Sequence, residues 1–481
     1  MNILKKLITR PGKSPKNKSS VLKIILFVLL FFLPLYPKFP LSLVEGTYVA
    51  IRLEDWVVFC SLLVWGFWQF KKGFPIFKQK IFKLFVFYWL VGLLSLLSGL
   101  LITQSVDWQL GALHFIRRIE YMSLFFIAFD ALAFTKITEF SFGLGLVSFL
   151  VFGYGMGQKY FGLPVISTMN EEFSKGLLLK LDEWTRISST FAGHYDLAAW
   201  LVMILALIPA LVLKTKKKLL KVWLVLGGGA SFYLLILTAS RISFVAYLIG
   251  ITTTLLFSRR WLWLPAVLGI SLFCGYQSKE LNTRLASSLP PAITEKVAST
   301  LKKEPMVSLA PTTAPMTKKE PTPTLLPTGP KGIKEIKKTI VYREVRSWPE
   351  PEEVAAAAAR SSQIRFQVEW PRAFKAFLKN PLLGTGYSSL GLATDNDYLR
   401  LLGETGILGF LAFGLIIFHL MRTGLVSLFK NRQLVAAGFL GVVFGFGANA
   451  IFIDVFEASK SAFYFWILMG MMYRLTMKNE K

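Results

Sequence analysis

Three polar side chains stand together just before an apolar segment late in the chain. Asp395, Asn396 and Asp397 follow one another in the sequence, within about one helical turn. A carboxylate at the mouth of a cavity can take a proton from an acceptor hydroxyl. The plainer alternative is that Asp395 or Asn396 caps a helix running through Tyr398 and Leu402. Capping uses one side chain and leaves the others unexplained, so both interpretations stay open.

Two arginines suggest a second kind of chemistry. Arg186 lies in 184-WTRISSTFAGHYDLAAW-200 and Arg241 in 238-TASRISF-244, each next to an apolar run. A guanidinium fork can give paired hydrogen bonds to phosphate oxygens, which suits a diphosphate. The alternative for Arg241 is a snorkelling side chain, with Ser240 capping the helix that follows.

The composition indicates that a membrane protein must position these residues. The 481 residues are 54% hydrophobic and their mean hydropathy is +0.52, which is unlike a soluble domain. Much of the formal charge of +27 lies in short loops between apolar runs. No basic surface is interleaved with stacking aromatics in a soluble module, so nucleic-acid binding is not expected.

The apolar runs predict an all-α polytopic membrane protein with about twelve transmembrane helices. The first run follows a basic segment but lacks a small-residue cleavage site, so we expect a retained helix and not a signal peptide. Nine spans fall within 21–276 and three within 406–477. The runs lie near 21–37, 54–70, 83–103, 113–134, 139–161, 196–213, 221–238, 242–257, 261–276, 406–421, 433–452 and 460–477.

The short basic loops predict the orientation of these spans. If the spans alternate, the basic loops all fall on one side, which is cytoplasmic by the positive-inside rule. Both termini are then cytoplasmic, in a multi-pass protein of the cytoplasmic (inner) membrane. Arg186 and Arg241 fall outside, against the usual bias, so a bound group should hold them there. The basic loops are 1–20, 71–83, 214–221, Arg259 with Arg260, 422–432 and the tail 478–481.

Two long segments are predicted to lie outside the membrane. One is 164–195, and the other is a large loop over about 277–405, before the last three helices. Within that loop, about 300–345 is rich in Pro, Thr and Lys and is expected to be a disordered linker. The part 351–380 is expected to be helical until Pro371, with a kink or break there.

Four segments of the chain resemble signature sequences of the O-antigen ligase and O-antigen polymerase superfamily. About a dozen spans with a large outer loop before the last few agree with that family too. Its pattern near this loop is His, then Asn, Ser or Gln, nine residues, and Gly-x-x-Gly. Asn396, Gly406 and Gly409 fit the spacing, whereas Asp395 stands where the family has His. The four segments are 186-RISSTFAGHYDLAAWL-201, 237-LTASRISFVAYLIG-250, 380-NPLLGTGYSSL-390 and 395-DNDYLRLLGETGILGF-410.

The resemblance implies glycan transfer on the outer face of the membrane by a GT-C-like helical fold. The donor would be a glycan on undecaprenyl diphosphate. The acceptor would be a hydroxyl of a lipid core, of another lipid-linked repeat, or of a protein. Such enzymes are regarded as metal-independent, so no cofactor is expected, and arginines stand in the metal's place.

In that setting Arg186 and Arg241 would hold the leaving diphosphate. Asp395 would act as the base or orient the acceptor, because burial near lipid can raise its pKa from about 4. His194 is a rival base, or else a partner or cap for Asp196 at a helix start. The residues expected to bind substrate are Asn396, Asp397, Tyr398, His194, Arg118 and Glu404.

Arg118 belongs to an outer-edge group with Arg117 and Glu120. Helical spacing puts Arg117 and Glu120 on one face, where they could form a structural pair or line the donor groove.

Three other functions compete with transfer of this kind. A flippase or other transporter of lipid-linked glycans would need charges deep along a path through the membrane. A metal-dependent oligosaccharyltransferase could use Glu54 and Asp55 with Asp395 and Asp397 around Mg or Mn, although acids at a helix start usually favour its dipole. An inactive relative is the third, since Asp395 replaces His.

Overall fold

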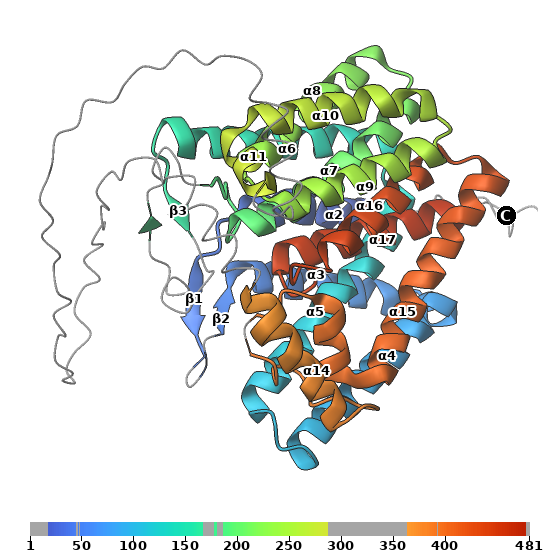
Figure 1. Ribbon diagram of the computed structural model, residues 1–481. Coiled ribbons are helices and arrows are strands. Elements are labelled where there is room, and N and C mark those ends of the chain that lie inside the picture. The colour runs from blue at the N-terminus through green and yellow to red at the C-terminus, as the bar shows by residue number, and fades with distance from the viewer. Residues whose placement is uncertain are drawn as a thin grey trace, which may run out of the picture.

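The protein is a bundle of helices with short β-hairpins at one end (Figure 1). The computed structural model describes residues 18–477 except 45, 46, 48, 167–177, 180–185, 287–362 and 392. Several predictions therefore lie outside the described residues. They concern the linker at 300–345, the helix expected over 351–362, most of the outer segment 164–195 and both ends of the chain.

Each predicted apolar segment coincides with a helix, and the all-α class is confirmed. Five helices are long and apolar enough to cross a membrane by length and composition: α4, α6, α7, α8 and α15 up to Lys430. Spanning by the others, and a GT-C-like topology, remain predictions. The helices are α2 (Lys18–Leu35), α3 (Leu53–Lys71), α4 (Lys80–Leu101), α5 (Trp108–Ala131), α6 (Ile137–Tyr160), α7 (His194–Lys214), α8 (Lys218–Leu237), α9 (Arg241–Phe257), α10 (Leu264–Gln277), α15 (Asp397–Asn431), α16 (Leu434–Asn449) and α17 (Ser459–Met477).

Shorter elements connect these helices. Two antiparallel hairpins were not predicted; they pair β1 (Pro40–Leu43) with β2 (Ala50–Arg52), and β3 (Val165–Ile166) with β4 (Leu178–Leu179). The labelled strands β1, β2 and β3 lie at the left end of the bundle in Figure 1. The remaining short helices are η1 (Pro75–Lys78), η2 (Leu132–Phe134), η4 (Trp261–Trp263), α11 (Lys279–Ala286), η5 (Ile364–Glu369) and α14 (Trp370–Lys379).

Small residues on α16 let the central helices pack closely. A Cβ added at Gly441 would lie 2.0 Å from Thr254 Oγ1, and one added at Gly445 would lie 3.1 Å from the carbonyl of Ala246. Thr254 uses its hydroxyl to donate to the carbonyl of Ala206 on α7, at 2.8 Å. Close backbone approach and interhelical hydrogen bonds are what hold helices together in lipid, so α7, α9 and α16 form the centre of the bundle.

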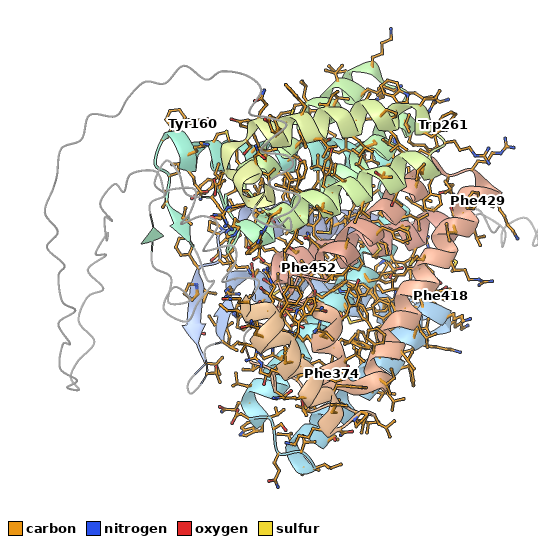
Figure 2. The ribbon with its side chains drawn as sticks, viewed as in Figure 1. Tyr160, Trp261, Phe374, Phe418, Phe429 and Phe452 are labelled. Carbon is orange, nitrogen blue, oxygen red and sulfur yellow. The ribbon has the colours of Figure 1, made fainter. Side chains whose placement is uncertain are left out.

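The outside of the bundle carries many large apolar side chains. Tyr160, Trp261, Phe374, Phe418 and Phe429 are each more than half exposed, and Figure 2 shows them on the periphery. A soluble protein rarely exposes such a surface. It suits contact with lipid, and aromatic rings are enriched where a membrane meets water.

Helix α15 contains a break at Gly406, where φ is 64° and ψ is −171°. Only glycine adopts this conformation readily. The segment after Asn380 fills the break: Thr385 N–H donates to the carbonyl of Gly403 and Gly386 N–H to that of Glu404, both at 2.9 Å. The other side of the break is satisfied in the same way, since Ile407 N–H donates to the carbonyl of Pro381 at 2.9 Å.

The helix over 364–379 runs through Pro371, so the predicted break there is not found. Glu369 and Trp370 keep right-handed helical angles, with φ/ψ of −73°/−51° and −65°/−46°. The change at this point is from the π-helix η5 to the α-helix α14. Pro371 is the second residue of α14, so the N–H that it lacks falls where the chain changes from π-helical to α-helical register.

We expect Gly406→Ala to destabilise the protein strongly, whereas Gly414→Ala in the same helix should not. A Cβ at Gly406 would meet the carbonyl oxygen of Leu382 at 2.3 Å, whereas a Cβ at Gly414 meets nothing within 4 Å. The first change should lower the free energy of unfolding by about 2 kcal/mol or more. The second should be neutral, or stabilising by up to about 1 kcal/mol. Thermal melting of both purified proteins in detergent tests this, and equal melting temperatures would contradict it.

Candidate active site

The loop that carries the acidic residues is built around one carboxylate, whose side chain is 12% exposed. Asp454, between α16 and α17, accepts hydrogen bonds from three successive backbone N–H groups: Thr394 at 2.8 Å, and Asp395 and Asn396 at 3.1 Å each. Asp395 is held with φ at 49°, a left-handed conformation that Asp tolerates better than most residues. This carboxylate therefore fixes the backbone that presents the Asp395 side chain.

Three of the predicted substrate-binding residues have structural partners. Asn396 is the N-cap of α15, because its side chain accepts a hydrogen bond from Leu399 N–H at 2.9 Å, as one of the two interpretations predicts. Asp397 is buried and accepts from Phe456 N–H at 3.0 Å. The Tyr398 hydroxyl donates to the carbonyl of Gly447 at 2.8 Å.

Glu404 and Arg118, two more predicted substrate ligands, lie in buried ion pairs. Arg400 is 2% exposed and bridges Asp454, at 3.0 Å, and Glu404, at 3.6 Å. Arg118 pairs with Glu457 and also donates to the carbonyl of Phe456 at 3.3 Å. Buried charges need such partners because they are costly to take out of water. These contacts join α5 and α15 to the segment that leads into α17.

Asp395 remains accessible within this network. Its side chain is 32% exposed, and Oδ2 accepts from Nε of Arg365 at 2.8 Å. Arg365 is itself almost fully buried and is supplied by η5, just before α14. Burial raises the pKa of Asp395, while the positive charge of Arg365 opposes that shift. Asp395 is thus a reachable carboxylate with an arginine on one of its two oxygens.

Arg186 and Arg241 lie at the same end of the bundle and close to Arg365. Arg241 is near enough to both other arginines to be repelled by their charges, and its Nη1 donates to the carbonyl of Arg284 at 3.1 Å. Three arginines, contributed by a loop, by the start of α9 and by η5, thus lie at this end of the bundle, and Arg365 is the one that contacts Asp395. The Ser240 cap of α9, expected from the sequence, is present, since its side chain accepts from Ser243 N–H.

Helix α11 covers this cluster with a carboxylate. Glu280 Oε1 lies 3.6 Å from Nε of Arg186 and 3.5 Å from Nε of Arg284. Burial raises the pKa of Glu280, and the charge of Arg186 opposes the shift. From the sequence, α11 is predicted to be part of a long loop, and Glu280 is not among the predicted site residues.

His194 contacts Arg186 and not Asp196, so the pairing expected from the sequence is corrected. Nη1 of Arg186 lies 2.5 Å from Nε2 of His194, and a guanidinium can only donate. Nε2 must therefore accept, which occupies the lone pair that a base would need. Asp196 instead faces Lys38, with 3.6 Å between Oδ2 and Nζ.

Arg117 joins α5 to the first hairpin. Its Nη2 donates to the carbonyl of Ala50 in β2 at 2.9 Å, so the side chain has a structural contact.

The carboxylates considered for a metal site have other contacts. Glu54 accepts from Ser459 Oγ at 3.0 Å, and Asp55 accepts from Arg52 N–H at 2.8 Å in the capping box of α3. Within the described part of the chain, no three or more His, Cys, Asp or Glu side chains are grouped to share an ion. Glu54, Asp55, Asp395 and Asp397 are therefore not gathered as the metal-dependent alternative requires.

The sequence held partial signals for the residues that were missed. Asp454 is a lone acid within 450-AIFIDVF-456, and an ionisable residue in such a run deserves a functional or structural partner. Arg400 and Glu404 have the i, i+4 spacing of a helical ion pair. Arg365 has no comparable signal, because it is one of several basic residues in the large loop.

Removing the Asp454 carboxylate should cost much more stability than removing an exposed acid. Asp454→Ala leaves three N–H groups and the buried Arg400 without their acceptor, so we expect a loss of about 3–5 kcal/mol. The matched control is Glu139→Ala, which removes the half-exposed pair with Lys23 and a capping hydrogen bond from Lys136 N–H and should cost about 1 kcal/mol. Thermal melting in detergent measures both, and similar losses would contradict this assignment.

Comparison with known proteins adds one finding. None of the curated proteins compared with the chain matches it. The family model described as O-antigen ligase matches residues 226–414, less than half of the chain. That region includes Arg241, Arg365 and Asp395 as well as the Gly406 break. The match supports a general function in lipid-linked glycan transfer, and with the apolar helices it points to a protein of the inner membrane. The resemblance seen in the sequence is thereby confirmed, because residues 226–414 match the O-antigen ligase family model.

Proposed function

We propose that the protein transfers a glycan from undecaprenyl diphosphate to an acceptor hydroxyl on the outer face of the cytoplasmic membrane. The observation that carries the proposal is the grouping of Arg186, Arg241 and Arg365 at the end of the bundle where Arg365 contacts the accessible carboxylate of Asp395. Cationic side chains grouped near a base are what displacement of a diphosphate requires. The fold would then be a GT-C-like transferase with its site outside the membrane.

The arginines would bind and stabilise the leaving diphosphate. Arg186 is oriented by His194 and Arg241 by the carbonyl of Arg284, so both forks are held in place before a ligand arrives. Preorganised donors stabilise charge that develops as a bond breaks. Glu280 shares Arg186 and Arg284 at distances of 3.6 and 3.5 Å, and an incoming diphosphate would take over these contacts.

Asp395 would accept the proton of the acceptor hydroxyl. The acceptor oxygen attacks the anomeric carbon and forms the new glycosidic bond. The bond between that carbon and the diphosphate oxygen breaks on the opposite side, and the diphosphate leaves with the electron pair. The configuration of the sugar inverts. Burial raises the pKa of Asp395, which strengthens it as a base relative to an exposed aspartate.

The other predicted ligands would position the site rather than touch substrate. Asn396, Asp397 and Tyr398 fix the start of α15, while Glu404 and Arg118 belong to the buried ion pairs below it. In this proposal they keep the Asp395 backbone in place.

Loss of the guanidinium group of Arg186 or of Arg241 should greatly reduce glycan transfer. We expect Arg241→Ala and Arg186→Ala to lower kcat by about 100-fold or more, as loss of one preorganised donor does. The assay uses purified protein in nanodiscs, a diphosphate-linked glycan donor and EDTA. It follows release of undecaprenyl diphosphate, and product size distinguishes a polymerase from a ligase.

Lys375→Ala is the matched control, because Lys375 is an exposed cationic residue of α14 in the same outer region. It should retain nearly full activity. Transfer that survives in Arg241→Ala and Arg186→Ala, or that stops with EDTA alone, would overturn the proposed role of the arginines.

The fall in activity at low pH should reflect protonation of Asp395, and the pH at which it occurs should depend on Arg365. Burial raises the pKa of Asp395, so kcat/KM should fall as pH drops through a value above about 4. Arg365 favours the ionised carboxylate. In Arg365→Gln the carboxyl should keep its proton to a higher pH, and the acid limb should move upward. Lys375→Gln is the control, and an unmoved or downward-shifted limb in Arg365→Gln would argue against Asp395 as the base.

A further inference from the structure

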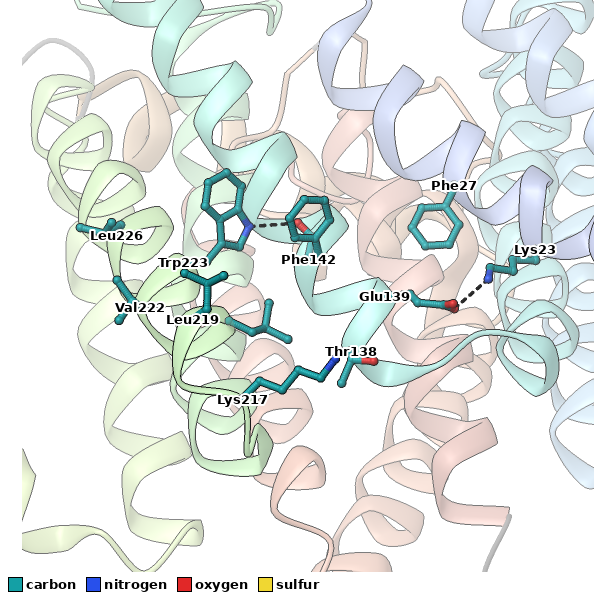
Figure 3. Close-up of a pocket in the computed structure, with 11 residues that line it drawn as sticks. Lys23, Phe27, Thr138, Glu139, Phe142, Lys217, Leu219, Val222, Trp223 and Leu226 are labelled. Atoms are coloured by element: carbon teal, nitrogen blue, oxygen red, sulfur yellow. Dashed lines mark hydrogen bonds and ion pairs between the residues drawn. The ribbon is translucent and has the colours of Figure 1, made fainter.

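A second candidate site lies at the opposite end of the bundle from the arginine cluster. A cavity of about 680 Å³ opens between α2, α6 and α8 (Figure 3). It is lined by Lys217 and the first half of α8, whereas Arg241 follows the far end of that helix. The 20 residues of α8 span about 30 Å, so the two sites are separate. The volume is in the range of ligand pockets, about 300–1,000 Å³.

Helices α6 and α8 pack tightly at a pair of glycines, and the cavity lies nearer to their first residues. A Cβ added at Gly227 would lie 3.6 Å from the Cα of Gly145, so the helices meet there. One turn nearer the helix starts, Trp223 stacks on Phe142, with ring centroids 5.5 Å apart, and its indole N–H donates to the carbonyl of Phe142 at 3.2 Å. Both rings line the cavity.

The walls of the cavity are apolar and face outward. Leu219, Val222 and Leu226 of α8 and Phe142 of α6 are each more than half exposed. Side chains of this kind in a membrane protein are covered by hydrocarbon. The cavity therefore offers a surface along which an acyl chain can lie.

The rim of the cavity is positively charged. Lys23 pairs with Glu139 at 2.9 Å, which cancels both charges. Lys217 has no ion-pair partner in the part of the chain that the structure describes, and in Figure 3 it extends across the cavity mouth toward Thr138. The net charge of the rim is thus that of one lysine, next to Lys216 and Lys218 in the sequence.

We propose that this cavity binds one anionic phospholipid of the cytoplasmic leaflet. The lipid phosphate would contact Lys217, and one acyl chain would run along Val222 and Leu226 toward Trp223. In the predicted topology this end of α8 is cytoplasmic, and that leaflet carries the anionic lipids that attract basic residues. Basic pockets between helices on this side are suited to such headgroups.

Native mass spectrometry of the full-length protein, titrated with phosphatidylglycerol or with phosphatidylethanolamine, tests the proposal. Wild-type protein should retain at least one phosphatidylglycerol at low lipid ratios and prefer it several-fold over phosphatidylethanolamine. Lys217→Glu should lose that preference, and Val222→Trp should lose the retained lipid by filling the cavity. Inorganic phosphate at millimolar concentration should not displace the lipid, because the acyl chain contributes to binding.

Lys216→Glu is the matched control, since Lys216 is exposed in the same basic run but does not line the cavity. It should bind lipid as the wild type does. Thermal melting and size-exclusion profiles check that all variants are folded. Equal retention of the two lipids, or equal losses in Lys216→Glu and Lys217→Glu, would overturn the proposal and indicate general annular lipid instead.

Discussion

A carboxylate removed from water must satisfy its oxygens with other donors, and Asp454 does so with three backbone N–H groups and Arg400. Because each of these donors is fixed in the chain, the loop before α15 has little freedom. The direction of the Asp395 side chain, the start of α15 and the position of Arg400 all follow from this arrangement. The cost of burying the charge is offset only while the whole set is intact.

The need of polar groups for partners also explains why the segment after Asn380 packs against the break at Gly406. Interrupting a helix frees backbone groups that lipid cannot satisfy, so another segment must supply partners. The chain after Asn380 does this, and it is tied to α4 as well, where Ser95 Oγ donates to the carbonyl of Glu404 at 2.6 Å and Asn380 donates to Ser98 Oγ at 2.8 Å. The backbone carbonyls of Gly403 and Glu404 and the N–H of Ile407, on the two sides of the break, thus have protein partners.

Local patterns predicted much of the fold and only part of the candidate site. Apolar runs located the helices because length and hydropathy are properties of single segments, and the Asn396 and Ser240 caps were visible for the same reason. The partners of Asp395 and Arg186 could not be predicted from such local patterns. Arg365 and Glu280 come from the large loop, and no periodicity says which distant side chain faces which. The passage of the helix through Pro371 was missed because it depends on where the helix starts, which the sequence alone left undefined.

The direction in which Arg365 points depends on the number of residues in the π-helix η5. A hydrogen bond of a π-helix joins residues five apart, whereas one of an α-helix joins residues four apart. Adjacent residues of an α-helix point about 100° apart. A chain one residue shorter between Arg365 and Trp370 could close into regular α-helix, and Arg365 would then point away from Asp395 while α14 stayed in place. A single-residue deletion or insertion here would change the chemistry beside Asp395 without replacing Asp395 or Arg365, which makes this short segment a point at which relatives could diverge in activity.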